Sequence, residues 1–326
     1  MSFPLTRPRR LRIKESTREL VREFRVSKND LVMPLFVRED IKAKVPIQSM
    51  PGIFQFPLKE AVEEARAIEG LGIKAVLLFG IPALKDKKAS QAYAGDGIIQ
   101  QALREIKKAA PGLTLIADTC LCEYTADGQC GIFKNGAVDN DASLELLAKT
   151  ALSQAEAGAD LVAPSAMLDG QVAVLRELLD QEEFFHTGIL SYAVKYASAF
   201  YGPFREAAGS QDNFKGDRKN HQMDPANLRE ALREAQADAE EGADLLMVKP
   251  AWNNLDVLAA LRANFPLPLA AYSVSGEYAM LKLAGQAGYF AEEAAVKELL
   301  TSIKRAGADV IITYYAREAV ERGWID

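Results

Sequence analysis

Short apolar runs rich in Val, Ile and Leu recur along the chain, and they are continuous rather than alternating. Strands that are covered on both faces, as in a parallel sheet flanked by helices, have this pattern. The pattern therefore predicts eight buried parallel strands. They are expected at Leu31–Val37, Ile73–Phe79, Leu113–Ala117, Ala159–Ala163, Gly188–Tyr192, Ala243–Val248, Pro268–Val274 and Ala308–Thr313.

Segments with helical periodicity lie between these runs, for example at Leu58–Glu69, Leu144–Ala157, Pro225–Glu240 and Glu292–Ala306. Asp224 and Pro225 are typical of a helix start, as N-cap residue and first-turn proline. Three joints between a helix and the next strand repeat nearly the same letters: ALSQAEAGADLVAP, EAQADAEEGADLLMV and LTSIKRAGADVIIT. Each contains a glycine where a helix C-cap requires a left-handed residue, namely Gly158, Gly242 and Gly307. The repetition indicates one β/α unit used many times.

A chain of 326 residues, 49% of them hydrophobic, can bury a large core as two ordinary domains or as one large barrel. Eight strands alternating with helices favour a (β/α)8 TIM barrel over a doubly wound sheet, which usually needs fewer strands. No GxGxxG loop follows the first strand, which weakens the dinucleotide-binding alternative. We therefore expect an N-terminal extended or helical arm at residues 1–28 and a barrel at residues 29–326, with its chemistry at the carboxyl ends of the strands.

The first 28 residues carry nine Arg and Lys against three Glu, a surplus of six positive charges in a chain whose net charge is −6. The rest of the chain therefore carries −12. One interpretation of this basic arm is a solvated tail. Another is nucleic-acid binding, but the arm lacks interleaved aromatic residues and no recognised motif follows it. The charge pattern favours a third, in which the arm lies on the acidic surface of a neighbouring subunit.

No apolar run approaches the roughly 20 residues of a membrane span, and the opening MSFPLTRPRR lacks the apolar stretch of a secretory signal. The sequence therefore predicts a cytoplasmic protein without a membrane segment. The cysteines, Cys120, Cys122 and Cys130, exclude a disulfide framework because they are odd in number and closely spaced. With only two histidines, His186 and His221, any metal site must depend on sulfur.

All three cysteines fall in the loop after the third predicted strand, in the sequence DTCLCEYTADGQCG. Gly128 and Gly131 let the backbone fold back so that the sulfurs can converge. Thiolates suit zinc, and three protein ligands leave a fourth position for water or substrate, as in catalytic rather than structural sites. The alternative, three small residues that are merely buried, fits a polar, glycine-containing loop poorly.

Two lysines lie at neighbouring strand ends. Lys249 ends the apolar run of the sixth strand, and Lys195 follows the fifth. Partial desolvation lowers the pKa of such a lysine from about 10.4 towards the range in which its neutral amine attacks a carbonyl, and a second ammonium nearby lowers it further. Taken singly, each could be a surface residue with an extended side chain. The pair beside a thiolate loop favours amine chemistry.

The segment from Tyr201 to Met223 is long, polar and glycine-bearing. It is either a solvated loop or a lid over the barrel mouth, in which Arg205 and Arg218 would bind a substrate carboxylate through their guanidinium forks. The last two strands end in Ser273-Val274-Ser275-Gly276 and Thr313-Tyr314-Tyr315. Their hydroxyls face the same mouth and could bind a second carboxylate, although Ser and Tyr at strand ends are common without such a function.

Six motifs, each in the expected order and spacing, extend over essentially the whole chain: ADTCLCEYTADGQCG, VAPSAMLDGQV, YAVKYASAFYGPFREAAGS, QMDPAN, MVKPAWNNLDV and YSVSGEY. Through them the sequence resembles the porphobilinogen synthase family, also called 5-aminolevulinate dehydratase. The resemblance implies a (β/α)8 barrel whose N-terminal arm wraps a neighbouring subunit, usually in a homo-octamer. It also implies condensation of two 5-aminolevulinate molecules to porphobilinogen with loss of two waters, on the route to haem.

The resemblance further implies roles for individual residues. Lys249 would form a Schiff base with the substrate that supplies the propionate side, and Lys195 with the other substrate. Polar residues would hold the rest of both molecules: Ser275 and Tyr314 the first carboxylate, Arg205 and Arg218 with Gln222 nearby the second, and Asp118 and Ser165 along the walls.

Two metals are implied as well. Cys120, Cys122 and Cys130 match the zinc-dependent branch of the family, and Glu234 aligns with a glutamate that binds an allosteric magnesium between subunits in some bacterial members. The match has three departures: many zinc-type members have histidines at the positions of Asp127 and Gln129, and a tyrosine at that of His221. These changes affect the surroundings of the three sulfur ligands, which are intact.

Two other functions compete with this one. A class I aldolase, another lysine-imine barrel, would explain Lys249 but leaves the cysteine loop and Lys195 without a role. A non-catalytic, metal-sensing assembly protein would use the basic arm to bind its partner. Only the first interpretation predicts that 5-aminolevulinate alone yields a pyrrole.

Overall fold

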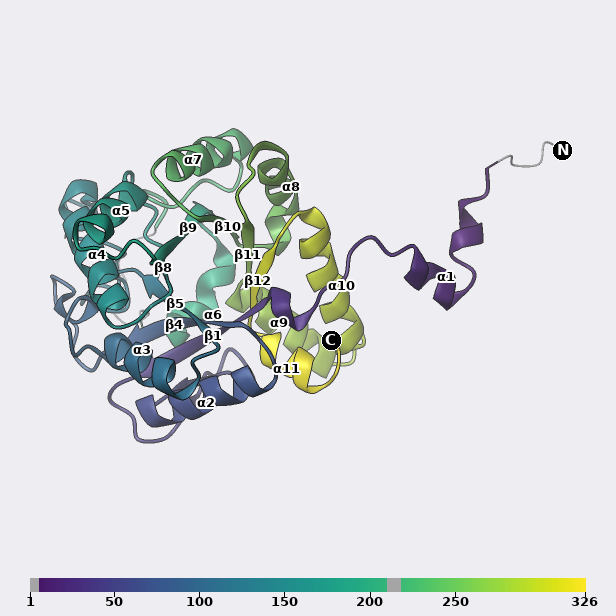
Figure 1. The fold of residues 1–326 in the computed structure, drawn as a ribbon, viewed down its shortest axis with the longest axis horizontal. Helices are drawn as coiled ribbons and strands as arrows, with labels where there is room; N and C mark the ends of the chain where they lie inside the picture. Colours follow the sequence, from purple (N-terminus) through teal and green to yellow (C-terminus); the bar gives the residue numbers. More distant parts are fainter. Residues whose placement is uncertain (1–5, 210–217) are drawn as a thin grey trace.

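The main sheet of the protein closes into a barrel. A computed structural model describes residues 6–209 and 218–326. Eight parallel strands form a ring because β12 pairs with β11 on one side and with β1 on the other, and helices surround them (Figure 1). The predicted (β/α)8 fold is confirmed. Around the ring, the strands are β1 (Leu31–Arg38), β4 (Ala75–Ile81), β5 (Thr114–Thr119), β8 (Leu161–Pro164), β9 (Gly188–Lys195), β10 (Leu245–Lys249), β11 (Leu269–Ser273) and β12 (Val310–Thr313).

Helices cover the outside of the ring (Figure 1). Their apolar faces pack on the strands, as the helical periodicity predicts. The longer helices are α2 (Leu58–Gly70), α3 (Ile98–Ala109), α4 (Asn140–Glu156), α5 (Gln171–Gln181), α7 (Leu228–Glu240), α8 (Leu255–Asn264), α9 (Ser275–Gln286) and α10 (Glu292–Ala306), and the shorter ones are α6 (Gly202–Ala207) and α11 (Ala316–Glu321).

One predicted helix start is wrong. Helix α7 begins at Leu228, three residues after Pro225. Asp224 does not cap it: its side chain accepts the Ala226 N–H at 2.9 Å, and its carbonyl accepts the Asn227 N–H at 3.0 Å. Aspartate followed by proline suits a turn as well as a helix start, because the side chain can satisfy a nearby N–H in either case.

The hydrophobic periodicity of the sequence does not predict the short elements, because a segment of two to four residues is too short to show a period. The β2–β3 hairpin extends the sheet beside β1, and the β6–β7 hairpin lies in the loop after β5. These strands are β2 (Val45–Pro46), β3 (Phe54–Phe56), β6 (Phe133–Lys134) and β7 (Ala137–Val138), and the 3-10 helices are η1 (Pro8–Leu11), η2 (Lys28–Asp30), η3 (Ser90–Ala92), η4 (Ala199–Tyr201) and η5 (Trp252–Asn254).

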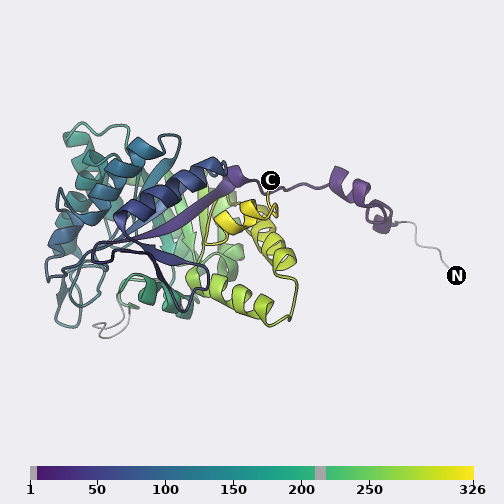
Figure 2. The ribbon, with the colours of Figure 1, turned by 90° about the horizontal axis from the view of Figure 1, so that it is seen from below.

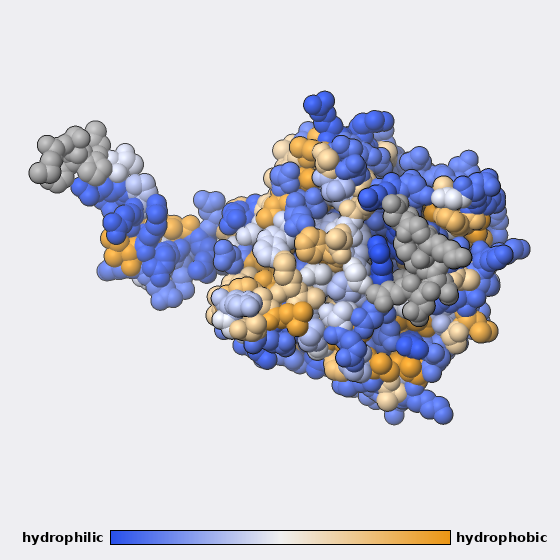
Figure 3. Space-filling view, turned by 180° about the vertical axis from the view of Figure 1, so that it is seen from behind, coloured by the Kyte–Doolittle hydropathy of each residue, from blue (hydrophilic) through white to orange (hydrophobic). Residues whose placement is uncertain are grey.

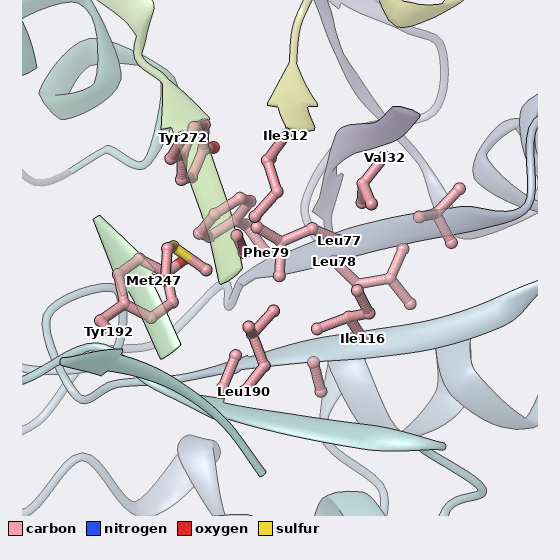
Figure 4. Packing of buried hydrophobic residues seen from close by; sticks show 14 of the residues in the cluster. Val32, Leu77, Leu78, Phe79, Ile116, Leu190, Tyr192, Met247, Tyr272 and Ile312 are labelled. Carbon is pink, nitrogen blue, oxygen red and sulfur yellow. The ribbon is translucent and has the colours of Figure 1, made fainter. Parts of the chain in front are cut away.

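The inside of the barrel is filled with side chains. Figure 4 shows residues from different strands meeting there, among them Val32, Ile116, Leu190, Met247 and Ile312. All five are buried. A packed interior of this kind is a core rather than a pore, so the chemistry is confined to the strand ends and the loops after them.

The repeated Gly-Ala-Asp joints have a common structure. Each aspartate side chain accepts one backbone N–H at the start of the neighbouring strand, a donor that must be satisfied once it is buried. The Leu115 N–H donates to Asp160 at 2.8 Å, the Ile189 N–H to Asp244 at 2.7 Å and the Leu269 N–H to Asp309 at 2.8 Å. The repeat therefore fastens neighbouring strands at the end of the barrel opposite the mouth.

Replacing Gly307 with alanine is expected to destabilise the protein by about 1–3 kcal/mol. Its φ is +126°, and a Cβ there would lie 2.7 Å from the Cβ of Arg262. Gly70→Ala is the matched control, because that glycine lies in a helix with nothing within 4 Å of the added carbon. Thermal unfolding measures both variants, and equal melting temperatures would contradict the strain argument.

The N-terminal arm projects away from the barrel. Residues 6–27 include η1 and α1 (Glu15–Leu20), and Figures 1 and 2 show them extended to one side. Figure 3 shows apolar side chains among the charged ones on this arm. Leu11, Ile13 and Leu20 are 53%, 74% and 82% exposed. The arm thus presents both apolar and basic side chains to its surroundings.

Within the described ranges, every helix is too short or too polar to span a bilayer.

Candidate active site

A small buried cavity lies at the carboxyl end of the barrel, where β5, β8, β9 and β10 end. Its volume is about 10 Å³, room for about one water molecule. The sequence predicts six of its lining residues as site residues, and the structure brings them together from distant parts of the chain. The lining consists of Phe79, Asp118, Cys122, Glu123, Ser165, Lys195, Tyr201, Phe204, Arg218 and Lys249.

Lys249 and Lys195 stand side by side, because they pair in the register of β10 and β9. Both amines lie over the ring of Tyr192, at 5.0 Å and 5.5 Å from its centroid. The Lys249 amine also faces the rings of Tyr272 at 4.3 Å and Phe204 at 5.1 Å. Burial, and then the charge of Lys195, lower the pKa of Lys249 to about 7. A neutral amine is therefore available near neutral pH.

Asp118 and Ser165 join the lysines to the cysteine loop. Ser165 donates its hydroxyl to Asp118 at 3.1 Å, and its carbonyl accepts the Lys195 amine. Burial, and then the charge of Glu123, raise the pKa of Asp118 to about 7. Asp118 is thus a carboxyl group that can hold or release a proton beside both amines.

The three cysteines converge. Their sulfurs lie within 4.8 Å of one another, all three are buried, and the Cys120 and Cys122 sulfurs are 3.4 Å apart. Hydrogen bonds from Cys120 and Cys122, and then the charge of Arg218, lower the pKa of the Cys130 thiol. A converging set with a stabilised thiolate has the chemistry that a soft metal ion requires.

Two features fold the cysteine loop into this shape. Gly128 has a φ of +68°, a conformation that favours glycine. Gly131 lies against Ser143 and Val138, where a Cβ would not fit. Behind the loop, Gln154 accepts the Thr119 hydroxyl at 2.7 Å and donates to the Asp118 carbonyl at 2.9 Å. The expected role of the glycines in turning the backbone agrees with this geometry.

The arginines lie near the loop. Arg218 is 5% exposed, and its guanidinium donates to the Gly128 carbonyl at 2.8 Å. Arg205 lies half-buried on α6, outside the cavity lining. The backbone N–H of Gln222 donates to the Arg218 carbonyl at 2.8 Å. The buried side-chain amide nitrogen of Gln222 has no hydrogen-bond partner in the described structure. Part of the segment predicted as a lid, residues 210–217, lies outside the described residues.

Ser275 and Tyr314 do not line the cavity; each is one side chain away from Lys249. The Ser275 hydroxyl accepts the Phe204 N–H at 2.9 Å, and the Phe204 ring lies next to the Lys249 amine. The Tyr314 hydroxyl is 3.0 Å from that of Tyr272, whose ring also contacts the Lys249 amine. Phe204 of helix α6 thus contacts both groups, Ser275 through its backbone N–H and the Lys249 amine through its ring.

Glu234 lies half-buried on α7, outside the cavity lining. Burial, and then the charges of Asp169 and Glu230, raise its pKa. The structure therefore separates it from the other predicted site residues and places it among acidic neighbours.

Sequence reasoning missed two kinds of residue. Glu123 is 2% exposed, and it accepts the Cys122 thiol at 3.2 Å. Its position next to a cysteine was the available signal, because a charged residue inside a buried loop needs a reason. Phe79, Tyr201 and Phe204 carried no such signal, since aromatic residues beside strands are ordinary core residues.

The comparisons with known proteins agree closely with one another. Residues 5–322 match the sequence model of the delta-aminolevulinic acid dehydratase family. Delta-aminolevulinic acid dehydratase of Bacillus subtilis (strain 168) is 53% identical over 321 residues, which cover 98% of this chain and 99% of that protein. The protein of the same name from Archaeoglobus fulgidus is 51% identical over 320 residues, with 98% of each covered.

A solved structure extends the likeness to three dimensions. Delta-aminolevulinic acid dehydratase (porphobilinogen synthase) of Toxoplasma gondii ME49, in complex with the reaction product porphobilinogen, superposes with a TM-score of 0.95 at 46% identity. The match covers 97% of this chain and 91% of that chain.

Proposed function

The chain belongs to the delta-aminolevulinic acid dehydratase family, and from this premise we propose that it joins two molecules of 5-aminolevulinate into porphobilinogen and releases two waters. The observation that carries the proposal is the pair of lysines on β9 and β10, facing a cluster of three cysteines. Porphobilinogen is a pyrrole precursor of haem, so the reaction serves tetrapyrrole biosynthesis.

Lys249 is the more reactive amine in this proposal, because its pKa is lowered to about 7. Its neutral nitrogen attacks the ketone carbon of one substrate, and loss of water leaves an imine. The carbon next to an imine loses a proton readily, and the resulting carbanion equivalent attacks the second substrate. Lys195, in register beside Lys249, holds that second molecule by the same chemistry. Two molecules held in one pocket react as if joined.

Asp118 is placed to handle protons in these steps. With a pKa of about 7 it exchanges a proton easily at neutral pH, and it lies between the lysines and the cysteine loop. Entry of two substrates requires more than the present 10 Å³. We infer that Phe204 and helix α6 move away as substrates enter, which exposes Ser275 and brings Arg205 towards a carboxylate. Gln222, with an unpartnered amide nitrogen, would donate to the same carboxylate.

Cys120, Cys122 and Cys130 would hold a zinc ion. Three sulfurs within 4.8 Å of one another fit the tetrahedral Zn–S distance of about 2.3 Å, with a fourth position left open. When bound, zinc supplies Lewis-acid chemistry to a substrate oxygen or amine. The protein's own contribution is a dry, buried loop whose Arg218 charge stabilises the Cys130 thiolate.

The remaining expectations concern assembly, magnesium and location. The basic arm, with its exposed apolar side chains, supports self-association on a neighbouring acidic barrel, and we propose the homo-octamer that the family resemblance implies. Glu234 stands beside Asp169 and Glu230, a carboxylate setting that suits an allosteric magnesium. We propose a cytoplasmic location, as expected from the sequence.

With zinc in excess, kcat/KM is expected to rise about tenfold per pH unit below about pH 7 and to level off above it. The reason is that only neutral Lys249 attacks, and its pKa is lowered to about 7 from an ordinary 10.5. Asp118 titrates in the same range, so the profile reports the coupled pair. A pH–rate profile of the purified enzyme measures this. A rise that continues to about pH 10 would show that Lys249 is not perturbed.

The function itself is tested by incubating the purified protein with 5-aminolevulinate alone and assaying for a pyrrole by a colour reaction. Pyrrole formation supports the proposal. An aldolase or a metal-sensing protein would form none.

A further inference from the structure

Glu277 is a fully buried carboxylate that the reaction chemistry does not use. It lies in the first turn of α9 and has no exposed surface, yet it is absent from the cavity lining. Burial raises its pKa, while hydrogen bonds from the Trp252 and Val274 N–H groups lower it and favour the charged form. A buried carboxylate costs free energy unless hydrogen bonds compensate it, so its bonds show what it does.

One oxygen of Glu277 holds the turn that carries Ser275. It accepts the N–H of Val274 at 2.9 Å, at the start of α9. A glutamate at the third helical position often makes this bond, and it fixes the direction in which the helix begins. Gly276, which follows Ser275, lies against the backbone of Phe200. A Cβ added at Gly276 would be only 2.6 Å from the Phe200 carbonyl oxygen. The turn is therefore held from two sides.

The other oxygen holds the loop after Lys249. It accepts the N–H of Trp252 at 2.8 Å. Trp252 lies three residues beyond Lys249, in the loop after β10, whereas Glu277 lies after β11. Helix capping needs only the first bond, so this second one requires another explanation. Around it, the Ala251 N–H donates to the Tyr272 carbonyl at 2.9 Å, which ties the same loop to β11.

Both backbone partners of Glu277 are N–H donors, so the site demands two acceptors at once. A carboxylate provides them, whereas the equally large amide of glutamine provides one acceptor and one donor. In glutamine, the amide nitrogen would face one of these backbone N–H groups. Both are donors, so the backbone N–H and the amide N–H would each lose a hydrogen-bond acceptor. The chemistry of the two bonds therefore specifies glutamate rather than any residue of its size.

We propose that Glu277 is a positioning residue, which holds the loop of Lys249 and the turn of Ser275 at a fixed separation. It thereby sets the distance between the amine that attacks the substrate ketone and the hydroxyl that binds the carboxylate of the same molecule. This inference rests on the proposed function, because it assigns the two groups to one substrate.

The test is Glu277→Gln with borohydride trapping. Wild type and variant are each reduced with 5-aminolevulinate present, and mass spectrometry measures the adducts on the Lys249 and Lys195 peptides. We expect kcat/KM to fall about 10–100-fold, and the ratio of Lys249 to Lys195 adducts to fall at least about fivefold. Loss of folded protein would lower both adducts equally. An unchanged ratio in a folded variant would overturn the proposal.

Asp244→Asn is the matched control. Asp244 also accepts a backbone N–H, that of Ile189 at 2.7 Å, but at the opposite end of the barrel. The same carboxylate-to-amide change there is expected to lower the melting temperature and leave the adduct ratio at its wild-type value. A ratio that falls equally in both variants would also overturn the proposal, since the effect would not depend on the site.

Hydrogen exchange of the wild-type enzyme gives a second test that does not depend on how the variant folds. Trp252 is 37% exposed as a residue, and its amide donates to Glu277, so we expect that amide to exchange faster once this bond is lost. We expect slow exchange at Trp252 and Val274, and fast exchange at either would refute the clamp. A wild type that forms neither pyrrole nor adducts would refute the proposed function instead, and exchange would still decide whether Glu277 holds the two segments.

Discussion

Replacing Lys249 with methionine is expected to lower the rate of pyrrole formation on the order of 10³-fold or more, because the amine that forms the imine is gone. Methionine keeps an unbranched side chain of similar length among the rings of Tyr192, Phe204 and Tyr272. It also removes a buried group whose charged form is disfavoured there. The melting temperature is therefore expected to stay the same or to rise. A colorimetric pyrrole assay and thermal unfolding measure the two effects.

Lys304→Met is the control for this substitution. Lys304 pairs with Asp30 at 2.9 Å, away from the mouth. Its loss is expected to leave kcat and KM near their wild-type values and to lower stability by about 1 kcal/mol. A Lys249→Met enzyme that keeps a tenth of the wild-type rate would remove Lys249 from the mechanism.

Replacing Cys130 with serine is expected to weaken zinc binding by about 10²-fold or more. The loss of a residue that only hydrogen-bonds to a metal ligand costs about 10- to 100-fold, and the loss of a ligand itself should cost more. The neighbours of Cys130 lower the pKa of its thiol. Of the three cysteines, Cys130 is therefore the one most readily present as the thiolate that binds a metal. Activity at limiting zinc is expected to fall with occupancy. Zinc content after dialysis at fixed free zinc, measured by mass spectrometry alongside the pyrrole assay, checks both.

Asp127→Asn serves as the control within the same loop. Asp127 accepts the Gln129 N–H at 3.2 Å and is not one of the three converging ligands. We expect this variant to keep its zinc. If wild type is fully active after complete zinc removal, or if Cys130→Ser binds zinc as tightly as wild type, the cysteine cluster is not a catalytic metal site.

The fold was predictable because the local signals agree with the global arrangement. Each predicted strand overlaps an observed one, since strands covered on both faces must be continuously apolar. Gly158, Gly242 and Gly307 have positive φ, as a helix end followed by a strand requires. The start of α7 was not predictable in the same way, because Asp224 followed by Pro225 satisfies a turn as readily as a helix.

The site was predictable as a set of residues, but not as a geometry. The strand-end rule indicates that Lys249, Lys195 and the cysteine loop share one mouth, and the structure brings them to one cavity. It does not reveal that Phe204 contacts both Ser275 and Lys249, because these contacts depend on where α6 packs. Nor does it reveal Glu277, whose partner Trp252 is 25 positions away in the chain. Such contacts are tertiary and leave no local pattern.

The most direct test of the account is the identity of the lysine that binds substrate. The enzyme is incubated with 5-aminolevulinate, reduced with borohydride and digested, and the modified peptides are identified by mass spectrometry. The account predicts a 5-aminolevulinate adduct on Lys249, at the end of β10. A modified protein whose Lys249 peptide is untouched would contradict it.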